Sequence, residues 1–259
     1  MNPLQASSDG REAFAKSDLF CEGFGMGRPA HGTVCREVEM SGHKVLFGEA
    51  DTGSGHGMYA TVECGRLWES EHLSDTASVI TMAVREIASA AVSFPPERIL
   101  VAALGNGRVT VDSVGSKAAD MIVPSGKGVK DVISEVYVIK TGVPAAVGMD
   151  SAEIVSVFAG YVKAQLIICI DSLAAATPQR LGTVVQVTDA GITPGSGLAQ
   201  RTVAISDATM GIPVIAVGVP TVIRSAEGGV IYTCAEASRL VDRAAAVIAG
   251  GVNGFLYGK

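Results

Sequence analysis

The stretch that decides the fold is Leu166-Ile167-Ile168-Cys169-Ile170-Asp171-Ser172-Leu173-Ala174-Ala175-Ala176. It opens as an unbroken apolar run rich in β-branched residues. That pattern is typical of a strand buried on both faces, as in a parallel sheet between layers of helices. Ligand sites of open α/β sheets gather outside the carboxyl ends of the strands, so we expect Asp171 to lie where this strand ends, at such a site. The alternative interpretation is a helix N-cap or turn aspartate.

Outward from this stretch, strands and helices alternate between residues 98 and 249, which indicates an α/β fold. Earlier in the chain, short strands are expected on both sides of a turn at Ser41-Gly42, and a helix with Ser74 as its N-cap follows. Capping-box patterns at Asp150 and Thr233 predict the starts of two later helices. Because no stretch has the composition of a linker, the sequence predicts one α/β domain over residues 17–259 with a β-rich N-terminal elaboration.

Composition narrows the class of protein. The formal net charge is −6, and no basic block or aromatic-basic patch occurs, so nothing favours nucleic-acid binding. The 5 cysteines are scattered and never form a CxxC pair, which is typical of a reducing compartment. Apolar stretches are too short to span a membrane, and no secretory signal is visible. We therefore expect a soluble, cytoplasmic protein.

Three aspartates share one context, since Asp112, Asp171 and Asp189 each come at or just after the end of an apolar segment. If the segments end at one rim of the sheet, their carboxylates can meet. Two close carboxylates cannot both ionise cheaply, and one then keeps a proton near neutral pH. Such a pair supplies a general base and a general acid. Helix caps and turns are the alternative roles for these aspartates.

Other motifs give weaker signals. The sequence DTGS at residues 51–54 is similar to the catalytic loop of pepsin-like proteases, but no second copy occurs and a β-turn explains it. The four histidines have no metal-ligand spacing, and neither a GxSxG elbow nor a phosphate-binding loop is present. We expect neither a metal nor a cofactor.

Several segments together resemble the germination proteases of spore-forming bacteria, which degrade small acid-soluble spore proteins. LGNGRVTVDSVG at 104–115 is similar to that family's GLGNWNVTPDALG, and IDSLAA at 170–175 to its IDALAA. DAGITPGSG at 189–197 is similar to DTGIHPGSG, and GIPVIAVGVPTV at 211–222 is almost the family sequence. Shorter likenesses lie at 17–19, 59–63 and 251–253.

The resemblance implies an atypical aspartic-type endopeptidase whose catalytic residues are Asp112 and Asp171, with Asn106 and Asp189 in supporting or substrate-binding roles. It also implies a three-layer, phosphorylase/hydrolase-like α/β fold with a mixed, mostly parallel sheet and helices on both faces. A homotetramer in the spore core is expected. Residues 1–16 are expected to form a propeptide that the zymogen removes by cutting near Phe14.

The chain departs from the family pattern at four places. Gly107-Arg108 stands where the family has Trp, Val111 replaces its Pro, and Thr193 replaces its His. A long insertion usual after the Pro220 region is also absent. These changes leave two alternatives open: a catalytically inactive relative that binds spore proteins, and a metal-binding maturation peptidase that uses the same carboxylates.

Overall fold

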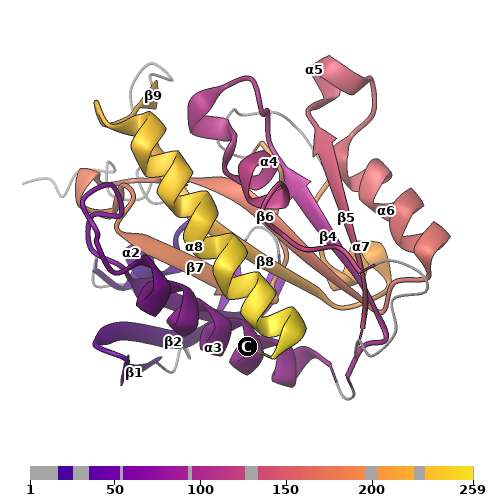
Figure 1. Cartoon of the computed structure of the whole chain (residues 1–259), viewed down its shortest axis with the longest axis horizontal. Helices are drawn as coiled ribbons and strands as arrows, with labels where there is room; N and C mark the ends of the chain where they lie inside the picture. The colour runs from indigo at the N-terminus through magenta and orange to yellow at the C-terminus, as the bar shows by residue number, and fades with distance from the viewer. Residues whose placement is uncertain are drawn as a thin grey trace, which may run out of the picture.

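The computed structural model describes residues 17–25, 35–52, 55–92, 95–125, 134–195, 203–224 and 231–258. Within these ranges the strands form one nine-stranded sheet in the order β1-β2-β3-β7-β8-β6-β4-β5, with β9 paired to β8 (Figure 1). The strands are β1 (Cys35–Met40), β2 (His43–Thr52), β3 (Gly55–Glu63), β4 (Arg98–Leu104), β5 (Glu135–Gly142), β6 (Leu166–Ala175), β7 (Val184–Thr188), β8 (Val214–Arg224) and β9 (Ile231–Tyr232).

The parallel part of the sheet is confined to β5, β4, β6 and β8. β6 lies between β4 and β8, and nine of its ten residues are buried. Its side chains alternate between the two faces: Ile168 and Ile170 join one hydrophobic cluster, Ile167 and Cys169 the other. The unbroken apolar run at the start of the strand follows from this burial on both faces.

The expected β-rich N-terminal elaboration extends the same sheet. Antiparallel pairs connect β1 to β2, β2 to β3, β3 to β7 and β7 to β8. The sheet is therefore mixed, as expected, but it contains more antiparallel pairing than the sequence predicted. The predicted turn between β1 and β2 is confirmed. Ser41 and Gly42 both have positive φ, of 48° and 78°, as a tight hairpin turn requires.

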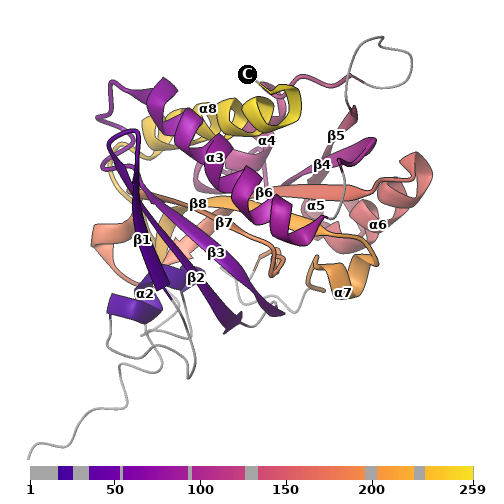
Figure 2. The ribbon, with the colours of Figure 1, turned by 90° about the horizontal axis from the view of Figure 1, so that it is seen from below.

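Helices cover both faces, which confirms the three-layer α/β class (Figure 2). α3, α4 and α8 lie on one face, while α6 and the segment that includes α2 pack on the other. The helices and short helical turns are α2 (Phe20–Gly25), α3 (Leu73–Ala91), η1 (Thr110–Asp112), α4 (Val114–Ala119), α5 (Pro144–Val147), α6 (Ser151–Val162), η2 (Pro178–Arg180), α7 (Asp207–Met210) and α8 (Ala237–Tyr257).

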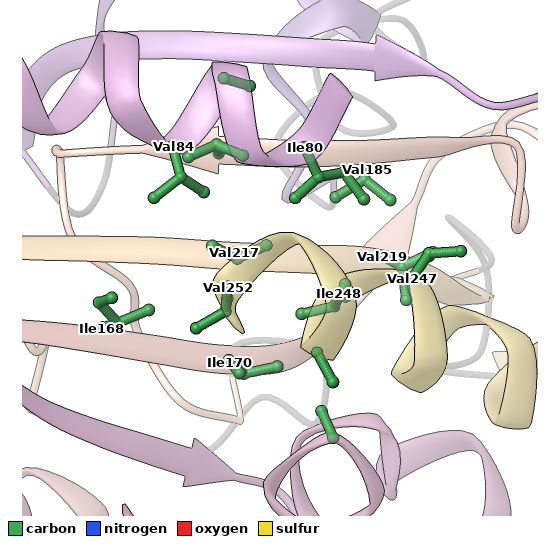
Figure 3. Close-up of a cluster of buried hydrophobic side chains, with 14 of the residues drawn as sticks. Ile80, Val84, Ile168, Ile170, Val185, Val217, Val219, Val247, Ile248 and Val252 are labelled. Carbon is green, nitrogen blue, oxygen red and sulfur yellow. The ribbon is translucent and has the colours of Figure 1, made fainter. Parts of the chain in front are cut away.

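The larger core fills the space between the sheet and the α3–α8 pair. Figure 3 shows Ile80 and Val84 of α3 and Ile248 and Val252 of α8 gathered near the branched side chains of β6, β7 and β8. Burial of each such side chain stabilises the fold by about 1.5–3 kcal/mol. Close contact of the two helices needs Gly251, because a Cβ there would lie 2.4 Å from Ile80.

Helix starts follow the predictions only in part. The capping box at Asp150 is confirmed, with the Asp150 N–H donating to Glu153 at 3.1 Å. The one expected at Thr233 is wrong: α8 begins at Ala237, and the Thr233 hydroxyl donates instead to the carbonyl of Thr221 at 2.8 Å. α3 likewise has His72 at its N-cap position, not Ser74, without a side-chain cap. Tertiary packing positions these two long helices more than their caps do.

None of the helices in the described ranges combines the length and hydropathy that a bilayer crossing requires.

A glycine substitution tests how α4 meets the sheet. A Cβ on Gly115 would lie 2.5 Å from the carbonyl oxygens of both Leu104 and Ile170, which are backbone atoms and cannot swing away. We expect Gly115→Ala to lower the free energy of unfolding by about 1–3 kcal/mol. Urea unfolding measures this change.

Gly160→Ala on α6 is the matched control, because nothing lies within 4 Å of the added Cβ. That variant should be stabilised by about 0.5–1 kcal/mol through the helix preference of alanine. Equal behaviour of the two variants would contradict the close approach of α4 to β4 and β6.

Candidate active site

The candidate site lies where β4 stops and its neighbour β6 continues. Pairing of β4 with β6 runs from Ile99↔Leu166 to Ala103↔Ile170, and β4 ends at Leu104. The chain then turns through Gly105 and Asn106 into η1, whose last residue is Asp112. α4 begins directly afterwards, held close to Leu104 and Ile170 by the missing side chain of Gly115. This connection brings Asp112 to the part of β6 that carries Asp171.

Asp171 lies within β6, not at its end as the sequence pattern suggested. The strand runs four residues further, because β8 continues to pair with it: Asp171↔Gly218 is followed by Ser172↔Val219 and, beyond a bulge, by Ala175↔Ile223. The Asp171 residue is only 5% exposed. One carboxylate oxygen, Oδ1, accepts a hydrogen bond from the Ser172 N–H at 2.8 Å.

Asp112 is held by the turn that carries it. Its Oδ2 accepts the backbone N–H of Asn106 at 2.8 Å. Gly105 has a φ of +84°, and a Cβ at this residue would lie 2.3 Å from the Asp112 carbonyl oxygen, so the turn needs glycine here. The preceding carbonyl, of Val111, accepts the Thr221 hydroxyl at 2.6 Å and ties η1 to β8.

The two carboxyl groups differ in environment. Burial raises the pKa of Asp171 well above its usual range; the negative charge of Asp112 raises it further, the Ser172 N–H opposes the rise, and Asp18 adds to it. Burial also raises the pKa of Asp112, opposed by the hydrogen bond from Asn106. Asp112 is the more exposed of the two. Burial and the charge of Asp112 thus favour the protonated form of Asp171, the more buried of the two carboxyl groups.

Asn106 contributes its backbone to the site. Its N–H binds Asp112, while its side-chain Oδ1 accepts the Arg108 N–H at 3.0 Å. The side chain thus shapes the turn, as asparagine often does.

Asp189 lies elsewhere, and the expectation that it shares a rim with the other two aspartates is wrong. β7 runs antiparallel to β8, so the end of β7 lies beside the start of β8, whereas Asp171 pairs further along at Gly218. Asp189 accepts the Met58 N–H at 2.6 Å. It lines a separate pocket of about 490 Å³, together with Glu49, His56 and Asp207.

The remaining sequence motifs stay outside the aspartate pair. Asp51 and Thr52 end β2, and they pair with His56 and Gly55 of β3 as parts of a hairpin; Gly53 and Ser54 lie outside the described residues. Within the described ranges, no group of three or more His, Cys, Asp or Glu side chains is arranged to hold a metal ion.

Sequence reasoning missed the contribution of the N-terminal segment. Asp18 lies close enough to Asp171 to influence its charge, and it hydrogen-bonds β6 at Ala174. These partners are 156 residues apart in the chain. No local apolar pattern or helix cap indicates a contact between residues so far apart. The one signal in the sequence was the resemblance of Ser17-Asp18-Leu19 to the family.

The buried carboxyl group of Asp171 has a consequence for stability that can be measured. Since the folded protein holds the Asp171 proton at pH values where the unfolded chain has lost it, the free energy of unfolding should fall as pH rises through that interval. Asp171→Asn removes this dependence. We expect the variant to gain stability relative to the wild type as pH increases from 4 to 8, about the usual aspartate range and above.

Denaturant unfolding across that interval provides the measurement, with Asp120→Asn as the control, because Asp120 is exposed and pairs with Lys140 on the surface. Parallel curves for wild type and Asp171→Asn would contradict a protonated Asp171.

Comparison with known proteins places the chain in a family. A family model described as germination protease matches residues 36–233. The chain is 35% identical to the germination protease of Clostridium acetobutylicum over 179 residues, covering 66% of this chain and 55% of that protein. For Caldanaerobacter subterraneus subsp. tengcongensis the identity is 35% over 187 residues, covering 68% and 56%. For Priestia megaterium it is 31% over 207 residues, covering 74% and 56%.

The chain thus spans little more than half the length of these curated relatives. Among solved structures, a [NiFe] hydrogenase maturation protease from Thermococcus kodakarensis is similar at a TM-score of 0.36 and 16% identity, over 60% of this chain and 91% of that one. That likeness is too slight to carry an argument. The match over residues 36–233, by contrast, covers more than half of the sequence, and it shows that the chain belongs to the germination protease family.

Proposed function

We propose that this chain is an endopeptidase that degrades small acid-soluble spore proteins at germination, with Asp112 and Asp171 as its catalytic pair. The observation that carries the proposal is the pair itself: a buried Asp171 inside β6 beside a more exposed Asp112. Family membership supports the peptidase class. Two unequal carboxyl groups that share one proton are suited to hydrolysis by an activated water.

In the proposed reaction, the ionised Asp112 takes a proton from a water molecule, whose oxygen attacks the carbonyl carbon of the scissile peptide bond. Asp171 donates its proton to the carbonyl oxygen, so that the tetrahedral intermediate carries no net charge on oxygen. On collapse, Asp112 gives its proton to the leaving nitrogen and Asp171 recovers one from the hydroxyl as the new carboxyl group forms. The proton count closes, and the pair returns to its starting state.

The departures from the family pattern leave the pair in place. Val111, where the family has Pro, still has its carbonyl tied to Thr221. Gly107 packs closely on Ser116, since a Cβ there would lie 2.8 Å from the Ser116 hydroxyl oxygen. The assay below distinguishes an active enzyme from an inactive relative that only binds spore proteins.

Several finer expectations stay predictions: the homotetramer, the spore-core location, and removal of residues 1–16 by cleavage near Phe14. Those residues lie outside the described ranges. The net charge of −6 is compatible with a neutral or basic protein substrate but does not select one.

The function is tested by incubating the purified chain with a small acid-soluble spore protein and following fragments by mass spectrometry. We expect the wild type to cut, and both Asp112→Asn and Asp171→Asn to lose about 10²–10⁴-fold in kcat, the usual contribution of a general acid or base. Asp120→Asn, an exposed aspartate paired with Lys140, is the matched control and should keep wild-type activity.

Full activity in both pair variants would refute the catalytic assignment. Binding of the spore protein without cleavage, over a range of pH, would instead support the inactive relative.

A further inference from the structure

The N-terminal segment formed by residues 17–22 fastens onto β6 just past Asp171. β4 ends at Leu104, so it supplies no partner for Ala174 of β6. Asp18 binds both backbone groups of Ala174: its N–H donates to the Ala174 carbonyl at 2.9 Å, and its Oδ2 accepts the Ala174 N–H at 2.8 Å. This contact falls at the β6 bulge between Leu173 and Ala174, three residues beyond Asp171.

A second carboxylate of the segment, that of Glu22, binds the residues that follow β6. Glu22 is 4% exposed. Its Oε2 accepts the Ala176 N–H at 2.7 Å, and its Oε1 accepts the Thr177 N–H and hydroxyl at 2.8 and 2.6 Å. Ser17 donates to Glu22 as well. Ala176 and Thr177 lie just after the end of β6, so Asp18 and Glu22 together fix the backbone there.

The segment is itself held rigidly on the sheet. Gln186 of β7 bridges it, accepting the Phe20 N–H at 2.7 Å and donating to the Asp18 carbonyl at 2.9 Å. The Phe20 ring stacks on Tyr59 with centroids 4.8 Å apart, and Leu19 is only 2% exposed. The position of Asp18 is therefore determined by the Gln186 bridge and by the packing of the two residues that follow it.

The two carboxylates of the segment differ in one respect. Asp18 acts electrostatically on Asp171, whereas Glu22 has no such effect among those identified for Asp171. The charged or titratable groups facing Asp171 are Asp112 from η1, Asp18 from the segment and the neutral thiol of Cys169 on β6 itself; β8 presents Gly218 there. No cation is among the groups that influence Asp171 in the described ranges.

We propose that Asp18 is a positioning residue of the aspartate pair: it holds the β6 backbone just past Asp171 and places a further negative charge beside the pair. The hydrogen bonds to Ala174 keep β6 in register where β4 has ended. The charge disfavours ionisation of Asp171, which therefore stays available as the proton donor. This inference deepens the proposed function and rests on it.

Three variants separate the charge of Asp18 from its hydrogen bonds. Asp18→Asn removes the charge and keeps an oxygen that can accept the Ala174 N–H. Asp18→Ala removes both. Glu22→Gln is the matched control, since it changes a buried carboxylate of the same segment that does not act on Asp171.

The first readout is independent of activity. Carboxyl ¹³C NMR titration of the aspartates follows Asp171, whose signal is identified by its absence in Asp171→Asn. We expect the midpoint of Asp171 to fall in Asp18→Asn and Asp18→Ala and to stay in place in Glu22→Gln. Amide hydrogen exchange at Ala174 should accelerate in Asp18→Ala only. In the spore-protein assay, the alkaline limb of kcat should move to lower pH with the midpoint.

An unchanged Asp171 midpoint in Asp18→Asn, or an equal fall in Glu22→Gln, would overturn the proposal. The two hypotheses fail separately. If the wild type cuts no peptide bond but the midpoint falls in Asp18→Asn, the charge effect stands and the proposed activity does not. If the wild type cuts and the pair variants are inactive while Asp18→Asn keeps both midpoint and pH limb, the activity stands and the role of Asp18 does not.

Discussion

A carboxyl group buried inside a β-sheet is the constraint on which the site depends. Burying a charge among the apolar layers of an α/β fold is costly, and the cost falls sharply if the group keeps its proton. Asp171 lies on β6, an interior strand of the sheet, paired to β8 and next to the end of β4. Its carboxyl group accepts the Ser172 N–H, and this hydrogen bond opposes the rise of the Asp171 pKa without cancelling it.

The surrounding chain packs closely around this carboxyl group. Gly105 and Gly115 let the turn after β4 and the start of α4 approach within distances that no side chain would allow, and they bring Asp112 to Asp171. The N-terminal segment, residues 17–22, binds the backbone at and just after the end of β6 through Asp18 and Glu22. Site residues thus come from distant parts of the chain, and the hydrophobic layers of α3, α8 and β6 hold them in place.

The two carboxyl groups differ in exposure, and this difference suits them to different roles in the proposed reaction. In the proposed reaction the buried member keeps the proton and the more exposed member accepts one, which is the division of roles that hydrolysis of a peptide bond by water needs. Membership of the germination protease family supports the peptidase class. The pocket lined by Asp189 lies near the start of β8, away from the pair.

The sequence by itself determined the features that depend on neighbours in the chain: the apolar run of β6, the Ser41-Gly42 turn and the capping box at Asp150. Hydrophobic periodicity and local hydrogen bonds carry these signals. Only the tertiary structure decided that β7 runs against β8 and removes Asp189 from the rim, that β6 continues past Asp171, and that Asp18 lies beside it. Strand direction, strand length and charge neighbours arise from pairing between residues far apart in sequence, and no local pattern encodes them.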